Sequence, residues 1–235
     1  MNSKLFSKLK SSAIGLQRSF GNFRDRGFNL RRGFSSAYTR LPRTILGFQY
    51  YQILLGANLA VFLLWNSGIV NHNTMLRHFA LSKATLAQGN IHTLLTYSIF
   101  HIDGWHLFAN AITLFFFGRN IELVFGAKRL LQLYIGGALA GALMQLPGYG
   151  TYNFLLGASS SSTSAILSYY ILSFPYEIIY LYFFPVPAWA FGLGFFGYSY
   201  LMMNSNSGGI AHGAHLGGLV FGAGMFMATR GRRFW

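Results

Sequence analysis

The chain has 235 residues, of which 53% are hydrophobic and only 9% are charged. A soluble domain carries about 25% charged residues, so this composition excludes an ordinary soluble protein and favours a membrane protein. The net charge of +14 does not indicate nucleic-acid binding, because more than half of the basic residues lie near the N-terminus. The absence of cysteine excludes disulfides and cysteine nucleophiles.

Residues 1–44 contain ten Lys or Arg residues, several serines and a single acid, Asp25. This composition is typical of a transit peptide for an organelle, and the mitochondrion is favoured over the plastid. The stretch RRGFSS resembles a matrix-processing site that would be cut after Phe34. We therefore expect a basic targeting presequence and linker over 1–44 and a membrane domain over 45–235. The alternative is a basic tail without a targeting role.

A helix that crosses a bilayer needs about 20 mostly apolar residues. Six stretches of the sequence approach this length, and helix breakers separate them. The sequence therefore predicts an all-α membrane protein with six transmembrane helices, over residues 45–65, 104–121, 130–146, 156–174, 187–204 and 210–229.

The basic residues predict how the six spans are oriented. Those between the second and third spans and those at the C-terminus share one side with the basic N-terminus, whereas only Arg77 and Lys83 lie on the other side. Because basic residues stay on the inner side of a membrane, we expect both termini in the matrix, with the protein in the mitochondrial inner membrane. The plastid inner envelope is the alternative.

This topology brings three polar clusters to the outer ends of three spans. His101, His106 and Asn110 begin the second span, the stretch GASSSSTS at 157–164 begins the fourth, and the pair His212 and His215 begins the sixth. Polar side chains inside a membrane are expensive and usually functional. We therefore expect the three clusters to form one site.

The residue types of the three clusters favour acyl transfer by a serine. A serine needs a base to become a nucleophile, and histidine is the usual one. Acyl transfer also needs hydrogen-bond donors for the oxyanion. Asp103 is the only acid on the outer side, so a Ser–His dyad is favoured over a triad. The sequence has no H-E-x-x-H motif and no pair of aspartates within its spans.

At residues 45–230 the sequence resembles the rhomboid family of intramembrane serine proteases. HIDGWHLFAN at 101–110 is similar to the family's H-x4-H-x3-N, and Glu122 with FG at 125–126 fits the pattern that follows. GAS at 157–159 matches the start of G-x-S-G, and AHGAHLGG at 211–218 is similar to A-H-x-x-H-x-x-G. The resemblance implies a six-helix rhomboid-like bundle.

The resemblance also implies roles for individual residues. Ser159 would be the nucleophile and His215 the general base, while His106, Asn110 and the N–H of Ser159 would form the oxyanion hole. His101 and His212 would support the site. The expected partners are single-pass membrane proteins, cleaved near the outer end of their span, and the lipid bilayer; no cofactor, metal or nucleic acid is expected.

Three positions depart from the family pattern. Ser160 stands in place of the second glycine of G-x-S-G, and Thr163 in place of an aromatic residue under the catalytic histidine. His92 and Thr93 replace a Trp-Arg pair of the first loop. The departures keep open a rhomboid-like protein that is inactive and binds membrane clients. A metal or haem site at His101, His106, His212 and His215 is a further alternative.

The remaining small residues of these spans are expected to be structural. Serines in membrane helices often only bond to the carbonyl four residues earlier or allow close helix packing. We expect such a structural role for Ser160, Ser161, Ser162 and Ser164. The spacing of Gly218 and Gly222 allows close helix packing. We expect Gly157 to pack in the same way.

Overall fold

The computed structural model describes residues 48–148, 150–151, 153–155, 159–181, 183–203 and 211–229, with the backbone alone described at 159, 160 and 181. The predicted presequence over 1–44, with its cleavage after Phe34, lies outside these residues. The elements in chain order are α2 (Tyr50–Ser67), α3 (His72–Phe79), α4 (Lys83–Ala87), α5 (Thr93–Thr96), η1 (Tyr97–Ile99), α6 (Gly104–Thr113), the π-helical turn η2 (Leu114–Gly118), α7 (Arg119–Phe125), α8 (Ala127–Gln145), η3 (Leu146–Gly148), α9 (Ser159–Ser173), β1 (Ile178–Leu181), β2 (Phe184–Pro187), α10 (Ala188–Met202) and α11 (His212–Thr229).

A long helix lies in each of the six predicted spans. These helices are α2, the continuous helix formed by α6, η2 and α7, and then α8, α9, α10 and α11; the largest boundary difference is at α2, which begins at Tyr50 rather than at residue 45. Among the described residues, two helices are long and apolar enough to cross a membrane, Gly104–Phe125 and Ala127–Gly148. That all six helices cross the membrane stays a prediction.

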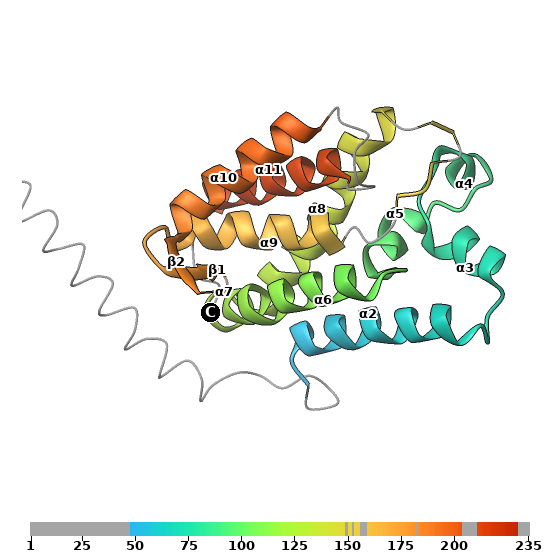
Figure 1. The fold of residues 1–235 in the computed structure, drawn as a ribbon, viewed down its shortest axis with the longest axis horizontal. Helices are drawn as coiled ribbons and strands as arrows, with labels where there is room; N and C mark the ends of the chain where they lie inside the picture. The colour runs from blue at the N-terminus through green and yellow to red at the C-terminus, as the bar shows by residue number, and fades with distance from the viewer. Residues whose placement is uncertain are drawn as a thin grey trace, which may run out of the picture. The chain divides into compact units, whose positions relative to one another are not determined.

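The helices run roughly lengthwise beside one another, with α3, α4 and α5 at one end and the hairpin of β1 and β2 at the other (Figure 1). The first end is the predicted outer end, and the second is the predicted inner end. The hairpin is antiparallel, with Ile178 opposite Pro187. It joins α9 to α10.

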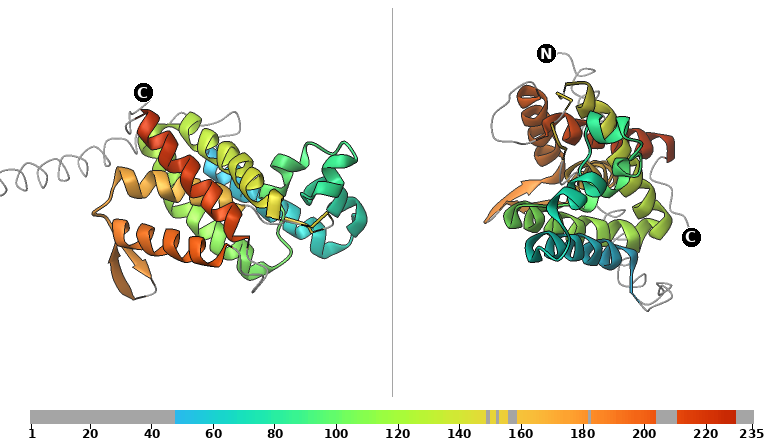
Figure 2. Two further views of the ribbon diagram at one scale, coloured as in Figure 1. Left: turned by 90° about the horizontal axis from the view of Figure 1, so that it is seen from above. Right: turned by 90° about the vertical axis from the view of Figure 1, so that its right-hand side faces the viewer.

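The helix α9 is the most buried helix, since every residue from 161 to 171 is buried. It packs mainly against α8 and α11, which also lie side by side (Figure 2). Small residues make this close packing possible. A Cβ added to Gly137 of α8 would lie 2.7 Å from Cβ of Ala165 in α9, so a larger residue would push the helices apart.

A buried acid joins the predicted inner ends of α2 and α7. Both oxygens of Glu122 accept hydrogen bonds from the first backbone N–H groups of α2, at 2.9 Å from Tyr50 and 2.8 Å from Tyr51. The first N–H groups of a helix have no partner within it and carry partial positive charge, so a carboxylate stabilises this end. Gly126 follows with φ +85° and ψ 160°, a conformation that only glycine adopts readily, and permits the one-residue turn into α8.

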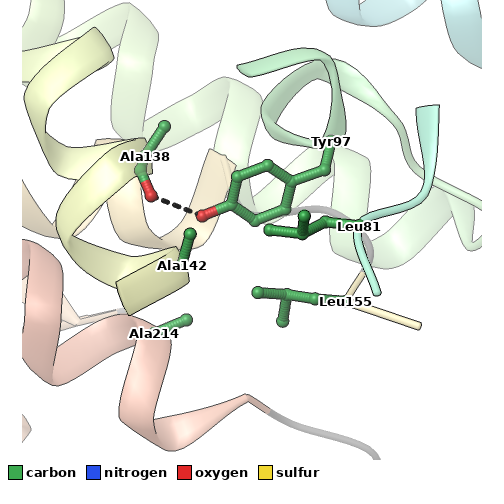
Figure 3. Packing of buried hydrophobic residues seen from close by; sticks show 6 residues of the cluster. All are labelled: Leu81, Tyr97, Ala138, Ala142, Leu155 and Ala214. Atoms are coloured by element: carbon green, nitrogen blue, oxygen red, sulfur yellow. Dashed lines mark hydrogen bonds between the residues drawn. The ribbon is translucent and has the colours of Figure 1, made fainter. Parts of the chain in front are cut away.

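The first loop is anchored to the segment that precedes α9. The backbones of Leu81 and Leu155 exchange two hydrogen bonds, at 3.1 and 2.7 Å. Beside them, the ring of Tyr97 is buried, and its hydroxyl donates to the carbonyl of Ala138 in α8 at 2.6 Å (Figure 3). These contacts hold the loop against the helices that carry the predicted site.

Candidate active site

The first cluster begins where α6 begins. The Asp103 carboxylate accepts a hydrogen bond from the backbone N–H of His106 at 2.8 Å and is the N-cap of α6. Asp is among the residues that best satisfy the free N–H groups of a helix start. Asp103 was the one acid on the predicted outer side, and it serves here to begin the helix that carries His106.

His101 lies in the loop before α6 and has no exposed surface. The edge of its ring meets the ring of His106, with 5.1 Å between the centroids and 76° between the planes. Burial, with a smaller contribution from His106, lowers the pKa of His101 to about 3. His101 is therefore neutral at physiological pH, which suits a residue that holds the loop against the helix.

Asn110 lies one turn beyond His106 and joins α6 to α9. Its amide nitrogen donates to the backbone carbonyl of His106 at 2.9 Å, and its amide oxygen accepts from the hydroxyl of Thr163 at 3.1 Å. Both Asn110 and Thr163 are buried. The structure therefore connects the second predicted span directly to the helix that begins with Ser159.

The second histidine pair lies on the first two turns of α11, against aromatic rings of α10. The ring of His215 lies 5.5 Å from that of Phe195, at 35°, and the ring of His212 lies 5.3 Å from that of Tyr198, at 78°. Nδ1 of each histidine is buried and has no hydrogen-bond partner in the part of the chain that the structure describes.

Two glycines determine how α11 lies along α9. A Cβ added to Gly218 would collide with the backbone of Ser161, and one added to Gly222 would collide with the backbone of Ala165. In each of these two contacts, the residue number in α11 exceeds the one in α9 by 57. The two helices therefore run in the same direction with a fixed register.

The same register gives the depth of His215. Subtracting 57 from 215 gives 158, which is one residue before Ser159, the first residue of α9. His215 therefore lies level with Ser159 to within one residue, or about 1.5 Å along the helix axis. The backbones of the predicted nucleophile and the predicted base therefore lie at one level on two helices in contact. The side chains of Ser159 and Ser160, and all of Gly157, lie outside the described residues.

The next serines of α9 have structural contacts. The hydroxyl of Ser162 donates to the carbonyl of Tyr134 in α8 at 2.8 Å. The hydroxyl of Ser161 lies 3.5 Å from that of Tyr97. Ser164 is buried. Ser161 and Ser162 therefore contact neighbouring elements, as expected for packing residues.

The replacement of the Trp-Arg pair is visible in the first loop. His92 precedes α5, and its ring stacks on that of His78, with 3.1 Å between Nε2 of His92 and Nδ1 of His78. The hydroxyl of Thr96 also donates to the carbonyl of His78. This pair holds α3 against α5 on the outer surface.

Sequence reasoning missed two residues that hold His215 in place. The side-chain oxygen of Gln145 in α8 accepts from the backbone N–H of Ala214 at 3.0 Å and so caps the first turn of α11. Gln145 was detectable as a polar side chain in a charge-free run at a helix end. Phe195 was not detectable, because it is one of many aromatic residues in its helix.

Among the residues that the structure describes, no three His, Cys, Asp or Glu side chains converge closely enough to hold a metal ion. A metal ion held jointly by His101, His106, His212 and His215 therefore has no support among these described residues, whereas a haem bound by one or two of them stays an alternative.

Known proteins resemble this chain in sequence. The sequence model of the Rhomboid domain matches residues 88–232, which include all three polar clusters. The chain belongs to the rhomboid family. This rhomboid is 33% identical to RHOMBOID-like protein 12, mitochondrial, from Arabidopsis thaliana, over 90% of the chain and 68% of the relative.

Two further relatives are more distant. Rhomboid protein 1, mitochondrial, from Saccharomyces cerevisiae is 30% identical over 72% of this chain and 50% of its own length. Rhomboid protease GluP from Bacillus subtilis is 30% identical over 41% of this chain and 19% of its own length. This rhomboid is therefore a helical membrane protein of the organellar type, and its mitochondrial relatives support a location in a mitochondrial membrane.

Proposed function

We propose that this rhomboid is an intramembrane serine protease that cleaves single-pass membrane proteins near the outer end of their spans. Ser159 is the nucleophile and His215 the general base. His106, Asn110 and the backbone N–H of Ser159 stabilise the oxyanion, and His101 and His212 support them. The protein lies in the mitochondrial inner membrane with both termini in the matrix, after removal of residues 1–34.

The register between α9 and α11 carries the proposal. General-base catalysis requires the base to come within hydrogen-bond reach of the nucleophile. The contacts of Gly218 and Gly222 with the backbone of α9 leave no room for a Cβ between the two helices, and their register supports a position of His215 at the level of Ser159.

The length of α9 supports cleavage within the membrane. Its 15 residues span about 22 Å at about 1.5 Å per residue, whereas the hydrocarbon core of a bilayer is about 30 Å thick. If the predicted inner end of α9 reaches the inner surface, its first residue lies several ångströms below the outer surface. A client span that reaches Ser159 must therefore enter or unwind within the bilayer.

The reaction follows from these positions. The Ser159 oxygen attacks the carbonyl carbon of the scissile peptide bond, and His215 accepts the hydroxyl proton. His106, Asn110 and the N–H of Ser159 donate to the resulting oxyanion. When the tetrahedral intermediate collapses, the C–N bond breaks and His215 returns the proton to the leaving amine. Water then hydrolyses the ester by the same steps.

The test uses the full chain, purified and reconstituted in liposomes, with a fluorophosphonate probe and a single-pass reporter protein. The parent should label with the probe and cleave the reporter. Ser159→Ala and His215→Ala should lower both to background. Asn110→Ala and His106→Ala should remain folded and bind the reporter but cleave at least about tenfold more slowly, because one oxyanion donor contributes about 100- to 1,000-fold.

Two results would contradict the proposal. Cleavage by Ser159→Ala at the parental rate would exclude Ser159 as the nucleophile. A parent that binds the reporter but neither labels nor cleaves would instead identify an inactive rhomboid that binds membrane clients.

A further inference from the structure

The hydroxyl of Thr163 is the one polar group of α9, among the described contacts, that touches a predicted oxyanion donor. Thr163 and Ser159 are four residues apart on α9 and therefore share a helix face. Thr163 is buried, as is its partner Asn110. This contact joins the nucleophile's helix to the oxyanion residues one turn below the reacting serine.

The neighbours of Asn110 determine which way its amide points. The backbone carbonyl of His106 can only accept a hydrogen bond, so the amide nitrogen of Asn110 must face it, at 2.9 Å. The amide oxygen must then face Thr163, at 3.1 Å, and the Thr163 hydroxyl must donate. A reversed amide would set two acceptors against each other at His106.

These two bonds leave one amide hydrogen of Asn110 for the oxyanion. An amide nitrogen carries two hydrogens, and one of them is occupied by His106. The terminal side-chain torsion angle of an asparagine has a broad distribution, so the side chain does not by itself fix the orientation of its amide. Holding the amide at both its oxygen and its nitrogen orients the second hydrogen before the substrate arrives, and this preorganisation is what makes an oxyanion donor effective.

We propose that Thr163 is a positioning residue for the oxyanion hole, which acts on the reaction only through Asn110. The inference rests on the proposed protease function. Thr163 departs from the family pattern, in which an aromatic residue stands at this position beneath the catalytic histidine. In this chain Phe195 of α10 supplies the ring against His215, so position 163 is available for the hydrogen bond to Asn110.

The test compares four variants with the parent in the liposome assay: Thr163→Val, Thr163→Ser, Asn110→Ala and the double variant of Thr163→Val with Asn110→Ala. Thr163→Val keeps the branched shape and removes the hydroxyl. We expect kcat to fall about three- to tenfold, as the loss of one neutral hydrogen bond predicts, with KM for the reporter unchanged. Thr163→Ser should restore most of the rate because it keeps the donor.

The double variant separates positioning from a general structural role. If Thr163 acts through Asn110, then Thr163→Val should lower kcat no further once Asn110 is alanine. Ser168→Ala is the matched control, because it also removes a buried hydroxyl of α9, which donates to the carbonyl of Leu219 at 2.9 Å. It should lower the melting temperature and leave kcat of the folded protein unchanged.

The outcomes distinguish the inference from the proposed function. A parental kcat for Thr163→Val, or an equal further loss in the double variant, overturns the positioning role while an inactive Ser159→Ala upholds the protease. A parent without activity overturns both. If Thr163→Val does not fold, the same cycle is run with Thr163→Ala, with rates taken per molecule labelled by the probe.

Discussion

Replacing Gly218 by alanine should force α9 and α11 apart. The added Cβ would lie 2.8 Å from the carbonyl carbon of Ser161 and 3.0 Å from its Cα, whereas ordinary contacts begin at 3.4 Å. The atoms it meets are backbone atoms of a buried helix and cannot turn aside. The closest collision is with the carbonyl oxygen of Ser161, and relieving the contact with the carbonyl carbon alone takes the 0.6 Å difference between 2.8 and 3.4 Å, so the helices must separate by more than 0.6 Å.

The expected free-energy change has two terms of opposite sign. Overpacking a tight contact costs about 1–3 kcal/mol. Alanine in place of glycine in a helix contributes about 0.5–1 kcal/mol of stability, because glycine loses more backbone entropy on folding. The two ranges combine to a fall of at most about 2.5 kcal/mol in the free energy of unfolding, and we expect a fall of about 1 kcal/mol. Because His215 lies one turn from Gly218, turnover should fall by about 10- to 100-fold, as misplacement of catalytic groups by about 1 Å can do.

Gly224→Ala is the matched control. Gly224 lies on the same helix, and within the described part of the chain no atom outside its own helix turn lies within 4 Å of the position of an added Cβ. The same chemical change should there keep or slightly raise the stability and leave turnover unchanged. Thermal unfolding in detergent and cleavage in liposomes measure both quantities. Equal stability and activity for the two variants would refute the register of α11 along α9, and with it the position of His215 at the level of Ser159.

Four other predictions concern single contacts. Glu122→Gln leaves only one side-chain oxygen for two N–H groups of α2, so the free energy of unfolding should fall by about 1–2 kcal/mol; an unchanged melting curve would contradict this cap. Gln145→Leu removes the acceptor of the Ala214 N–H, which should lower both stability and turnover, and Gln145→Glu, which keeps an oxygen, should preserve both. Phe195→Leu should lower turnover about three- to tenfold, since an aromatic contact contributes about 0.5–1.5 kcal/mol, while Phe195→Tyr should not. The pKa of His101 is lowered from 6.5 to about 3, so between these pH values the unfolded chain binds a proton that the folded chain does not. The free energy of unfolding should therefore fall as the pH drops from about 6.5 to about 3, by up to about 1.4 kcal/mol per pH unit. His101→Gln should flatten this slope in pH-dependent unfolding.

Much of the architecture could be read from local patterns. The apolar runs and their breakers located six long helices, because helix formation in an apolar environment depends mainly on sequence-local hydrogen bonding and hydrophobicity. The spacing of His106 and Asn110 placed them on one face of a helix, and the structure has them one turn apart in α6. The span predicted over 104–121 includes η2, but its π-helical geometry and the extension of the helix to Phe125 were not predicted, because no residue type marks a π-helical turn.

The contacts that connect the helices could not be read in this way. The pairings of Thr163 with Asn110, of Gln145 with Ala214 and of Phe195 with His215 join residues 53, 69 and 20 positions apart. Each depends on the rotation and register of two helices, which the packing of the whole bundle decides.

The sequence by itself determined the class of protein, the helices and the residue types of the site, because composition and period are local properties. Only the tertiary structure decided that Thr163 holds Asn110. It also decided that α11 lies against α9 with His215 level with Ser159. The physical reason is that glycines allow two backbones to touch in many registers, and the register is selected only when α8, α9 and α11 fill the same space together.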